Sequence, residues 1–252
     1  MPEPSSEFSV RLAETDEDLR AAQALRYKVF VSELGGDGDL VDHEAGLERD
    51  RFDPYFDHML LTDTQTGEVV GVYRLLTDER ASEIGEFYSE AEYDLAPLKS
   101  SGRKLLELGR SCLHRDYRGG AGMYHLWNGL AQYVTERQIE VLFGVASFPG
   151  TDVAALAAPL SLLHDRHLAP KELRVRSRRY QPMDLIEPGI LDRRKAMVEV
   201  PALIKAYLRL GGFVGDGAYV DHSFNTTDVC LILDTERMNA RQRKIYSGRS
   251  DG

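Results

Sequence analysis

The stretch LLELGRSCLHRDYRGGAG, residues 105–122, decides the fold prediction. Residues 105–113 predict a buried β-strand, in which Glu107 and Arg110 interrupt an otherwise apolar run. Charged side chains inside such a strand are rare unless they are paired or functional. Three glycines follow within four residues, Gly119, Gly120 and Gly122, and a helix is expected directly after them.

A strand, a glycine-rich turn and a helix together can hold a phosphate, because bare backbone N–H groups converge at the positive end of the helix. The segment therefore predicts an acid/base group and an anion site about one strand length apart. The alternative is a Glu–Arg pair inside a core, followed by an ordinary left-handed turn. The residues alone leave both interpretations open.

Composition limits the class of protein. The chain has 252 residues, 42% of them hydrophobic and 29% charged, which is typical of one large globular domain or a core with an added lobe. Its net charge of −10 argues against broad nucleic-acid binding.

The two cysteines lie in separate apolar runs and predict reduced thiols in the cytoplasm. No Cys/His cluster has metal-ligand spacing, so no metal is expected. The polar start predicts no signal segment, and no run approaches the ~20 apolar residues of a membrane span.

Hydrophobic periodicity gives the order of elements. Thr15 and Asp18 form a capping box at the start of a helix that is expected to run to about Leu34. We expect strands at 8–13, 58–62, 68–77, 105–113, 140–148 and 228–233, and further helices at 120–137, from Thr151 or Asp152 to His167, and at 201–210. This order predicts an α+β, or mixed α/β, fold. Antiparallel strands come first, and a strand–helix–strand crossover lies at the centre of the sheet.

Two further arginines lie inside apolar patterns. Arg26 lies on the apolar stripe of the first helix, either as a surface arginine with a buried stem or as a site residue. Arg74 lies inside the apolar strand at 68–77. The polar segment 35–56 between them is longer than an ordinary connection. Its acids suit a cationic amino-acid substrate, and the alternative is a solvated charged loop.

A basic cluster interrupts the acidic chain at residues 171–179. Such a cluster can dock an acidic carrier protein or anionic lipid headgroups. The alternative is an edge strand whose charges prevent aggregation. The cations are Lys171, Arg174, Arg176, Arg178 and Arg179. More cations follow at 193–195 and in the tail, at Arg237, Arg241, Arg243 and Lys244.

Seven short segments between residues 25 and 211 together resemble the GNAT acyltransferase superfamily, and more narrowly the N-acyltransferases of ornithine-lipid biosynthesis. The first four of them, at 25–30, 50–53, 70–76 and 107–111, also resemble acyl-homoserine-lactone synthases. The resemblance implies a GNAT-like core at 8–150, with a central mixed sheet flanked by helices. Residues 151–246 are then a C-terminal extension that continues the same domain. The segments are LRYKVF (25–30), DRFD (50–53), VGVYRLL (70–76), ELGRS (107–111), DYR (116–118), LFGVASF (142–148) and YLRLG (207–211).

The resemblance also implies a site. In the homoserine-lactone relatives, the counterparts of seven residues cluster around the substrate amine. Five are expected to bind substrate here: Arg26, Phe30, Asp50, Asp53 and Arg74. Glu107, Arg110 and Ser111 are expected to form the catalytic group. Within it, Ser111 is either a structural hydroxyl or a substrate contact. Glu107 is the expected general base, because a carboxylate in a partly dry strand can accept a proton from an ammonium. His114 is either a second base or a bystander, and Cys112 is assigned to the core.

The donor implied by the resemblance is acyl carrier protein, with no bound cofactor beyond its 4′-phosphopantetheine arm. The glycines after Arg118 come one residue earlier than in the usual GNAT pyrophosphate loop, which favours this donor over coenzyme A. A backbone N–H near Leu113 is expected to stabilise the oxyanion. The basic cluster at 171–179 is expected to dock the carrier. The arm is expected to contact Leu113, His114, Arg118, Gly119, Gly120 and Gly122.

The predicted function is N-acylation of ornithine with a 3-hydroxyacyl chain, by direct attack of the amine on the thioester. Glutamine and lysine are alternative acceptors. An S-adenosylmethionine-dependent lactone synthase is the second hypothesis, and a non-catalytic carrier-binding protein is the third. The first hypothesis also implies a peripheral location on the inner membrane and a downstream O-acyltransferase as partner.

Overall fold

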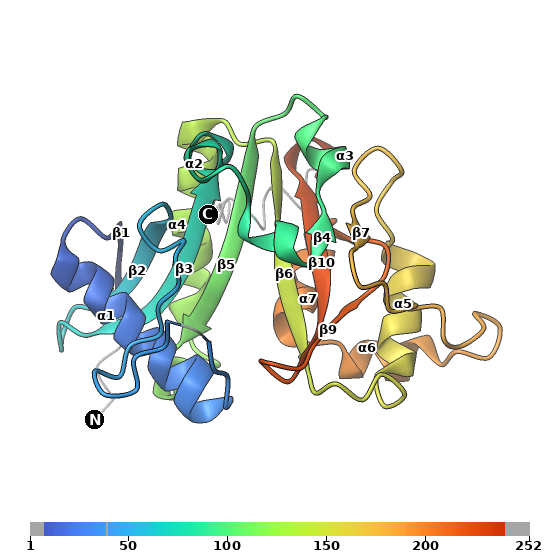
Figure 1. The fold of residues 1–252 in the computed structure, drawn as a ribbon, viewed down its shortest axis with the longest axis horizontal. Helices are drawn as coiled ribbons and strands as arrows, with labels where there is room; N and C mark the ends of the chain where they lie inside the picture. Colours follow the sequence, from blue (N-terminus) through green and yellow to red (C-terminus); the bar gives the residue numbers. More distant parts are fainter. Residues whose placement is uncertain (1–7, 39, 240–252) are drawn as a thin grey trace, which may run out of the picture. The chain divides into compact units, whose positions relative to one another are not determined.

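The computed structural model describes residues 8–38 and 40–239, which divide into two compact units (Figure 1). Unit 1 comprises the described residues up to Leu76 together with residues 108–137, and unit 2 comprises residues 77–107 and the described residues from Gln138 onward. No described helix is long and apolar enough to cross a lipid bilayer. In chain order the elements are β1 (Phe8–Leu12), α1 (Asp16–Arg26), a π-helix (Tyr27–Glu33), β2 (Asp57–Asp63), β3 (Val69–Thr77), α2 (Asp78–Ile84), a 3-10 helix (Tyr88–Ala91), β4 (Tyr93–Asp94), α3 (Ala96–Lys99), β5 (Leu105–Leu113), a 3-10 helix (Arg115–Tyr117), α4 (Gly122–Arg137), β6 (Val141–Pro149), α5 (Ala157–His167), β7 (Arg176–Ser177), α6 (Arg193–Glu199), α7 (Ala202–Arg209), β8 (Phe213–Val214), β9 (Tyr219–Asp221), β10 (Thr226–Asp234) and a 3-10 helix (Thr235–Arg237).

The strands of unit 1 follow the predicted hairpin pattern. β1 pairs antiparallel with β2, and β2 pairs antiparallel with β3, which neighbours β5. The turn between β2 and β3 contains Gly67 with φ 74°, a backbone conformation that glycine adopts without strain. The predicted capping box is present at α1: the Thr15 side chain accepts from the Asp18 N–H, and the Asp18 side chain accepts from the Thr15 N–H.

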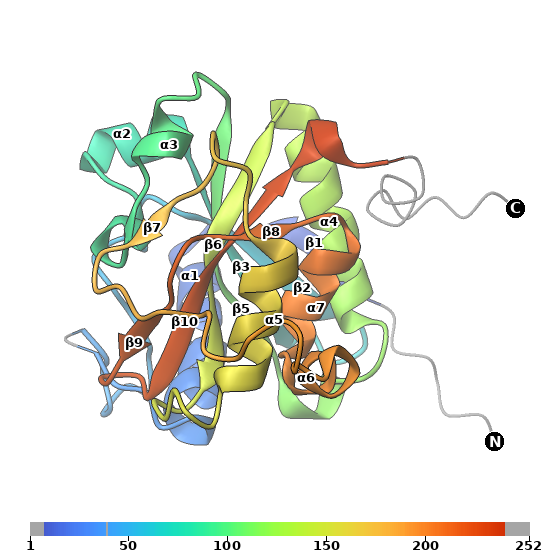
Figure 2. The same cartoon turned by 90° about the vertical axis from the view of Figure 1, so that its right-hand side faces the viewer.

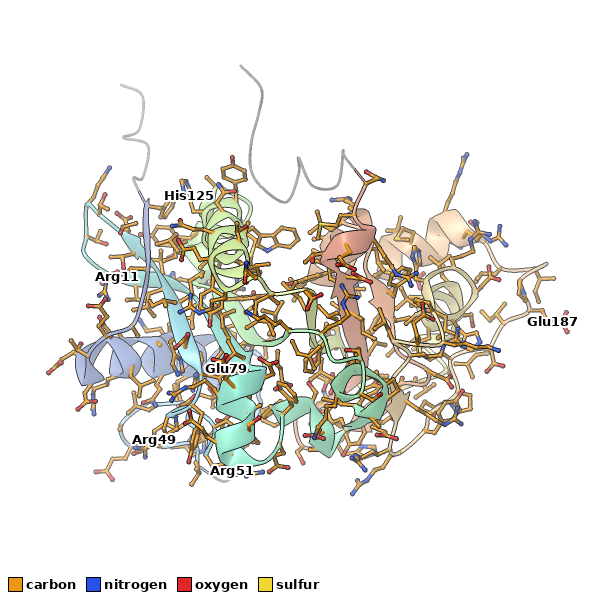
Figure 3. All side chains as sticks on the ribbon, turned by 90° about the horizontal axis from the view of Figure 1, so that it is seen from above. Arg11, Arg49, Arg51, Glu79, His125 and Glu187 are labelled. Atoms are coloured by element: carbon orange, nitrogen blue, oxygen red, sulfur yellow. The ribbon has the colours of Figure 1, made fainter. Side chains whose placement is uncertain are left out.

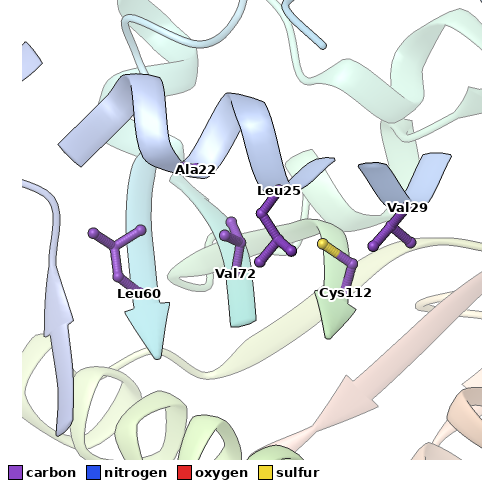
Figure 4. Close-up of a cluster of buried hydrophobic side chains, with 6 residues drawn as sticks. All are labelled: Ala22, Leu25, Val29, Leu60, Val72 and Cys112. Atoms are coloured by element: carbon purple, nitrogen blue, oxygen red, sulfur yellow. The ribbon is translucent and has the colours of Figure 1, made fainter. Parts of the chain in front are cut away.

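Helices α1 and α4 cover opposite faces of the β1–β2–β3 sheet. Leu60 of β2 and Val72 of β3 pack against Leu25 of α1 in a buried apolar cluster (Figure 4). Met59 faces α4 instead, close to Gly129. Successive side chains of a strand point to opposite faces, so one apolar strand is covered by both helices. Cys112 belongs to the α1 cluster, as predicted for a core residue.

Unit 2 contains the parallel pair. β5 and β6 pair in parallel from Leu105↔Val141 to Glu107↔Phe143. β10 pairs antiparallel with β6 along its whole length, and β8 and β9 pair with β10. Figure 2 shows α5 and α7 in front of β8 and β10. The fold is therefore α+β, with a mixed sheet flanked by helices, as predicted.

Three predicted elements differ in detail. The first helix changes from α to π geometry at Tyr27, so only its first part is α-helical. α5 begins at Ala157 rather than near Asp152. Pro159 explains this later start, since it fits only the first turn of a helix. The predicted edge strand at 171–179 is reduced to β7, because most of its arginines bond to the protein instead of extending a ladder.

Candidate active site

The centre of the candidate site in unit 1 is a buried arginine. Arg26, at the end of α1, is fully buried, so the interpretation as a surface arginine is wrong. Its Nη1 and Nη2 donate to the two Asp53 carboxylate oxygens at 2.8 and 2.7 Å. Its Nε lies 2.6 Å from the Glu48 carboxylate. A buried guanidinium is tolerated only with such partners, so Arg26 fixes the loop that carries both acids.

Arg74 of β3 joins the same network. Its Nη1 donates to Asp50 at 2.6 Å and to Asp53 at 2.9 Å. Its guanidinium carbon lies 4.2 Å from the centre of the Phe56 ring. Asp53 therefore bridges the arginines of α1 and β3, and the polar loop before β2 is folded around them rather than being a solvated loop.

Arg110 of β5 forms the outer part of the network. Its backbone is left-handed, with φ 49°, a conformation uncommon for any residue except glycine. Its Nε donates to Glu48 at 3.0 Å, and an Nη lies 3.7 Å from Asp50. The Phe30 ring of the π-helix is 5.9 Å from its guanidinium carbon. Three arginines and three acids thus balance in charge at one place.

The two aspartates of this network are held in the ionised form. Burial opposes the charged form of Asp53, but hydrogen bonds from Arg26 and the charges of Arg26 and Arg74 outweigh it and hold the pKa of Asp53 below its usual range. Asp50 is buried too, and the charges of Arg74 and Arg110 lower the pKa of Asp50. Burial lowers the pKa of His58, which keeps its ring neutral. Such carboxylates suit the binding of an ammonium group rather than the acceptance of a proton.

The side chains of this network differ in solvent exposure. The Arg110 and Asp50 side chains are 15% and 19% exposed, whereas the Glu48 side chain is 2% exposed. Phe30 is also partly exposed. Arg26, Arg74 and Asp53 lie beneath them, sealed from water. A guanidinium beside a carboxylate at an accessible edge matches the two charges of an amino acid.

Glu107, in unit 2, is held by backbone and side-chain donors. The Ser89 N–H and hydroxyl donate to its Oε1 at 2.6 and 2.5 Å, and the Tyr88 N–H donates to its Oε2 at 2.8 Å. These donors stabilise the charged carboxylate. A cavity of about 330 Å³ in unit 2 is lined by residues that include Phe87 and Leu105, whereas Glu107, Tyr88 and Ser89 do not line it.

The predicted phosphate loop in unit 1 is closed by Arg118. Its Nε donates to the Leu113 carbonyl at 3.1 Å, and an Nη pairs with Glu33 at 2.8 Å. The His114 N–H donates to Val70 at 2.8 Å. Gly119 has φ 80°, and a Cβ added to Gly122, the first residue of α4, would lie 3.2 Å from the Leu61 side chain. Contact of this loop with a pantetheine arm stays a prediction.

The basic cluster of unit 2 is largely engaged with the protein. Arg176 pairs with Asp216 at 2.5 Å, and the Nε atoms of Arg174 and Arg178 donate to backbone carbonyls at 2.6 Å each. Arg179 lies over the Tyr219 ring, and Lys171 is exposed. Arg237 pairs with Asp234 and Glu172, whereas Arg241, Arg243 and Lys244 lie outside the described residues.

Two residues of this network, Glu48 and His58, were not predicted as site residues. Glu48 lies two positions before the DRFD segment, and nothing in the sequence distinguishes it from Glu44. His58 opens an apolar strand, where its Nε2 hydrogen-bonds the Asp53 carbonyl at 3.0 Å. A polar residue within an apolar strand was the available signal for His58, as it was for Arg74.

Known proteins share this architecture. A family model described as an acetyltransferase (GNAT) domain matches residues 25–128. FeeM, an N-acyl amino acid synthase from uncultured soil microbes, superposes with a TM-score of 0.52 at 11% identity, over 95% of this chain and 98% of that chain. The AHL synthase LasI superposes with a TM-score of 0.51 at 18% identity, over 97% of this chain and 96% of that chain. The family model and these superpositions show that the fold is of the GNAT type.

Sequence relatives narrow this class to one family. An L-ornithine N(alpha)-acyltransferase of Rhodobacter capsulatus is 58% identical over 97% of this chain and 96% of its own length. A protein of the same name from Brucella abortus is 40% identical over 97% of this chain and 90% of its own length. The chain belongs to the L-ornithine N(alpha)-acyltransferase family, and it is therefore an enzyme rather than a non-catalytic binding protein.

Proposed function

We propose that this enzyme acylates the α-amine of L-ornithine, with a 3-hydroxyacyl group delivered by acyl carrier protein. The observation that carries the choice of acceptor is full-length similarity to relatives named for that reaction. The site supports it, since Arg110 offers a guanidinium for the α-carboxylate and Asp50 an ionised carboxylate for an ammonium group.

The reaction needs no covalent enzyme intermediate. The amine nitrogen attacks the thioester carbonyl carbon, the C–N bond forms, and the C–S bond breaks to release the pantetheine thiol. The amine gives up a proton, and the departing sulfur takes one. The two cysteines of the chain are poor nucleophiles: burial raises the pKa of Cys112 to about 12, and burial raises the pKa of Cys230 further. Their state supports direct transfer.

Glu107 remains our proposed proton acceptor. Its carboxylate is buried. The three donors from Tyr88 and Ser89 fix it in place, and hydrogen bonds of this kind favour the charged form of a carboxylate, which a general base requires. They also compete with any new proton, so transfer through a water molecule is part of the proposal. Ser111 is proposed as a substrate contact.

The proposed donor site is the loop that Arg118 closes after β5. A carrier-bound pantetheine arm presents one phosphodiester, which the glycines before α4 and the Arg118 guanidinium suit in charge and size. No resident cofactor is needed in this scheme. In the basic cluster we propose Lys171 and Arg179 as the main contacts with the acidic carrier, since the other three arginines already bond within the protein.

We also propose peripheral contact with the inner membrane, where an acylated amino acid would partition and an O-acyltransferase would act on it. Ile190 and Val198 are 78% and 76% exposed and flank the exposed cations Arg193–Lys195. Glu187, labelled in Figure 3, lies shortly before Ile190, and its negative charge disfavours contact with anionic lipid headgroups. Flotation with phosphatidylglycerol vesicles tests this part. Ile190→Ser with Val198→Ser should abolish binding, and unchanged binding would contradict the proposal.

Product analysis tests the reaction. The purified protein is incubated with 3-hydroxyacyl-acyl carrier protein or the matching coenzyme A thioester, and with L-ornithine, L-lysine, L-glutamine or S-adenosylmethionine. We expect mass spectrometry to detect N-acylornithine from the carrier-bound donor. Exclusive formation of a homoserine lactone would replace the proposal with the second hypothesis. Equal rates with coenzyme A would refute the carrier as the specific donor.

A further inference from the structure

Glu48 is the most deeply buried acid of the unit 1 network, with its side chain 2% exposed. Its carboxylate connects two arginines: one oxygen lies 2.6 Å from the Arg26 Nε, and the other accepts from the Arg110 Nε at 3.0 Å. Its backbone is fixed as well. Its N–H donates to the Gln23 carbonyl at 3.1 Å, and its carbonyl accepts from Arg26 at 2.6 Å. Glu48 therefore joins the rigid part of the network to its exposed edge.

The residue that depends on Glu48 is Arg110. An arginine with positive φ is strained, and such strain persists only where surrounding contacts hold it. Glu48 accepts the Nε–H of Arg110 at 3.0 Å, which fixes the Nε end of the guanidinium. The second acid near Arg110, Asp50, lies at 3.7 Å and is shared with Arg74. Glu48 is therefore a buried acceptor that holds the Nε side of this guanidinium in place.

We propose that Glu48 is a positioning residue that acts through Arg110 and gives the enzyme its preference for an acceptor with a free α-carboxylate. The inference rests on the proposed function, in which Arg110 binds that carboxylate. A guanidinium binds a carboxylate with two parallel hydrogen bonds only when its plane is correctly set. Glu48 supplies that orientation before substrate arrives, and Arg26 holds Glu48 in turn.

The test compares L-ornithine with L-ornithinamide, which lacks the carboxylate charge. Glu48→Asp keeps the charge but is one methylene shorter, so it cannot reach both arginines. We expect its KM for L-ornithine to rise about 10- to 100-fold, the effect of misplacing a binding group by ~1 Å. The selectivity for L-ornithine over L-ornithinamide should fall by the same factor, and the KM for the acyl donor should not change.

Glu48→Gln separates orientation from charge and serves if the aspartate variant does not fold. Loss of negative charge alone would strengthen carboxylate binding and raise the selectivity for L-ornithine. Loss of orientation lowers it, because a glutamine amide can accept from only one of the two arginines. Gln23→Ala is the matched control: it removes a 3.0 Å side-chain hydrogen bond to Asp53, keeps the Gln23 carbonyl that accepts from the Glu48 N–H, and should leave the selectivity unchanged.

Wild-type selectivity in either folded Glu48 variant would overturn the proposal, whatever happens to kcat. A fall in the Gln23→Ala control as large as that in Glu48→Asp would also overturn it, because the effect would then be general to the network. If the wild-type enzyme acylates a different amino acid, the proposed acceptor is wrong. The same ratio, measured with that amino acid and its amide, then decides the role of Glu48.

Discussion

Replacing Glu107 by glutamine tests whether the Glu107 carboxylate acts as a general base or only as a structural anchor. The amide keeps the shape of the side chain but turns one acceptor into a donor, which must face the Tyr88 N–H or the Ser89 N–H. One buried donor then loses its partner, at a cost of about 1–3 kcal/mol in the free energy of unfolding. The free energy of unfolding of a typical domain is ~5–15 kcal/mol, so the variant should stay folded. Loss of a general base lowers the rate about 10²- to 10⁴-fold.

The assay measures kcat with 3-hydroxyacyl-acyl carrier protein and L-ornithine, alongside urea unfolding of the same preparation. Ser89→Ala is the control, since it keeps the carboxylate and removes only the hydroxyl donor. We expect similar losses of stability in the two variants and a large loss of kcat in Glu107→Gln alone. Near-wild-type turnover of Glu107→Gln removes it from proton transfer. Equal loss of turnover in both variants assigns Glu107 to support of the Tyr88–Ser89 segment.

Three further predictions concern the buried groups. Asp53→Asn should lose about 3–5 kcal/mol at pH 7, because it leaves buried arginines undercompensated. Since folding lowers the pKa of Asp53, its stabilisation is full above the unfolded value of ~3.9 and fades as the pH falls towards the folded value, so acid unfolding should be less steep in the variant. Gly129→Ala should cost about 1–3 kcal/mol in urea unfolding, as its Cβ would lie 2.6 Å from Val10, whereas Gly189→Ala meets open space and should change little. Cys112 should resist iodoacetamide at pH 8 until the protein unfolds, since burial raises the pKa of its thiol to about 12, and rapid labelling of the native protein would contradict its burial.

Much of the fold could be predicted because its signals are local. The capping box at Thr15, the glycine turn of the β2–β3 hairpin and the apolar run of β5 each depend on residues close together in sequence. The start of α5 was misplaced, although Pro159 was a local signal for it. The change to π geometry after Arg26 had no such signal.

Only part of the candidate site could be predicted from the sequence. Charged residues inside apolar patterns pointed to Arg26, Arg74, Glu107 and Arg110, because an unpaired charge in a core is costly. Their partners could not be assigned, since Glu48, Asp50 and Asp53 lie in an irregular loop without periodicity. The three-dimensional path of that loop decides which acid meets which arginine.

The sequence by itself determined the order of strands and helices, the strand–glycine–helix segment and the presence of buried charge. Backbone conformation and hydrophobic periodicity depend on residues that are close together in sequence, so these features could be predicted locally. Only the tertiary structure decided that Asp53 bridges Arg26 and Arg74, that Glu48 pairs with Arg110, and that Ser89 anchors Glu107. These contacts join residues 18 to 62 positions apart. Their choice depends on which charges burial forces together, a property of the folded chain as a whole.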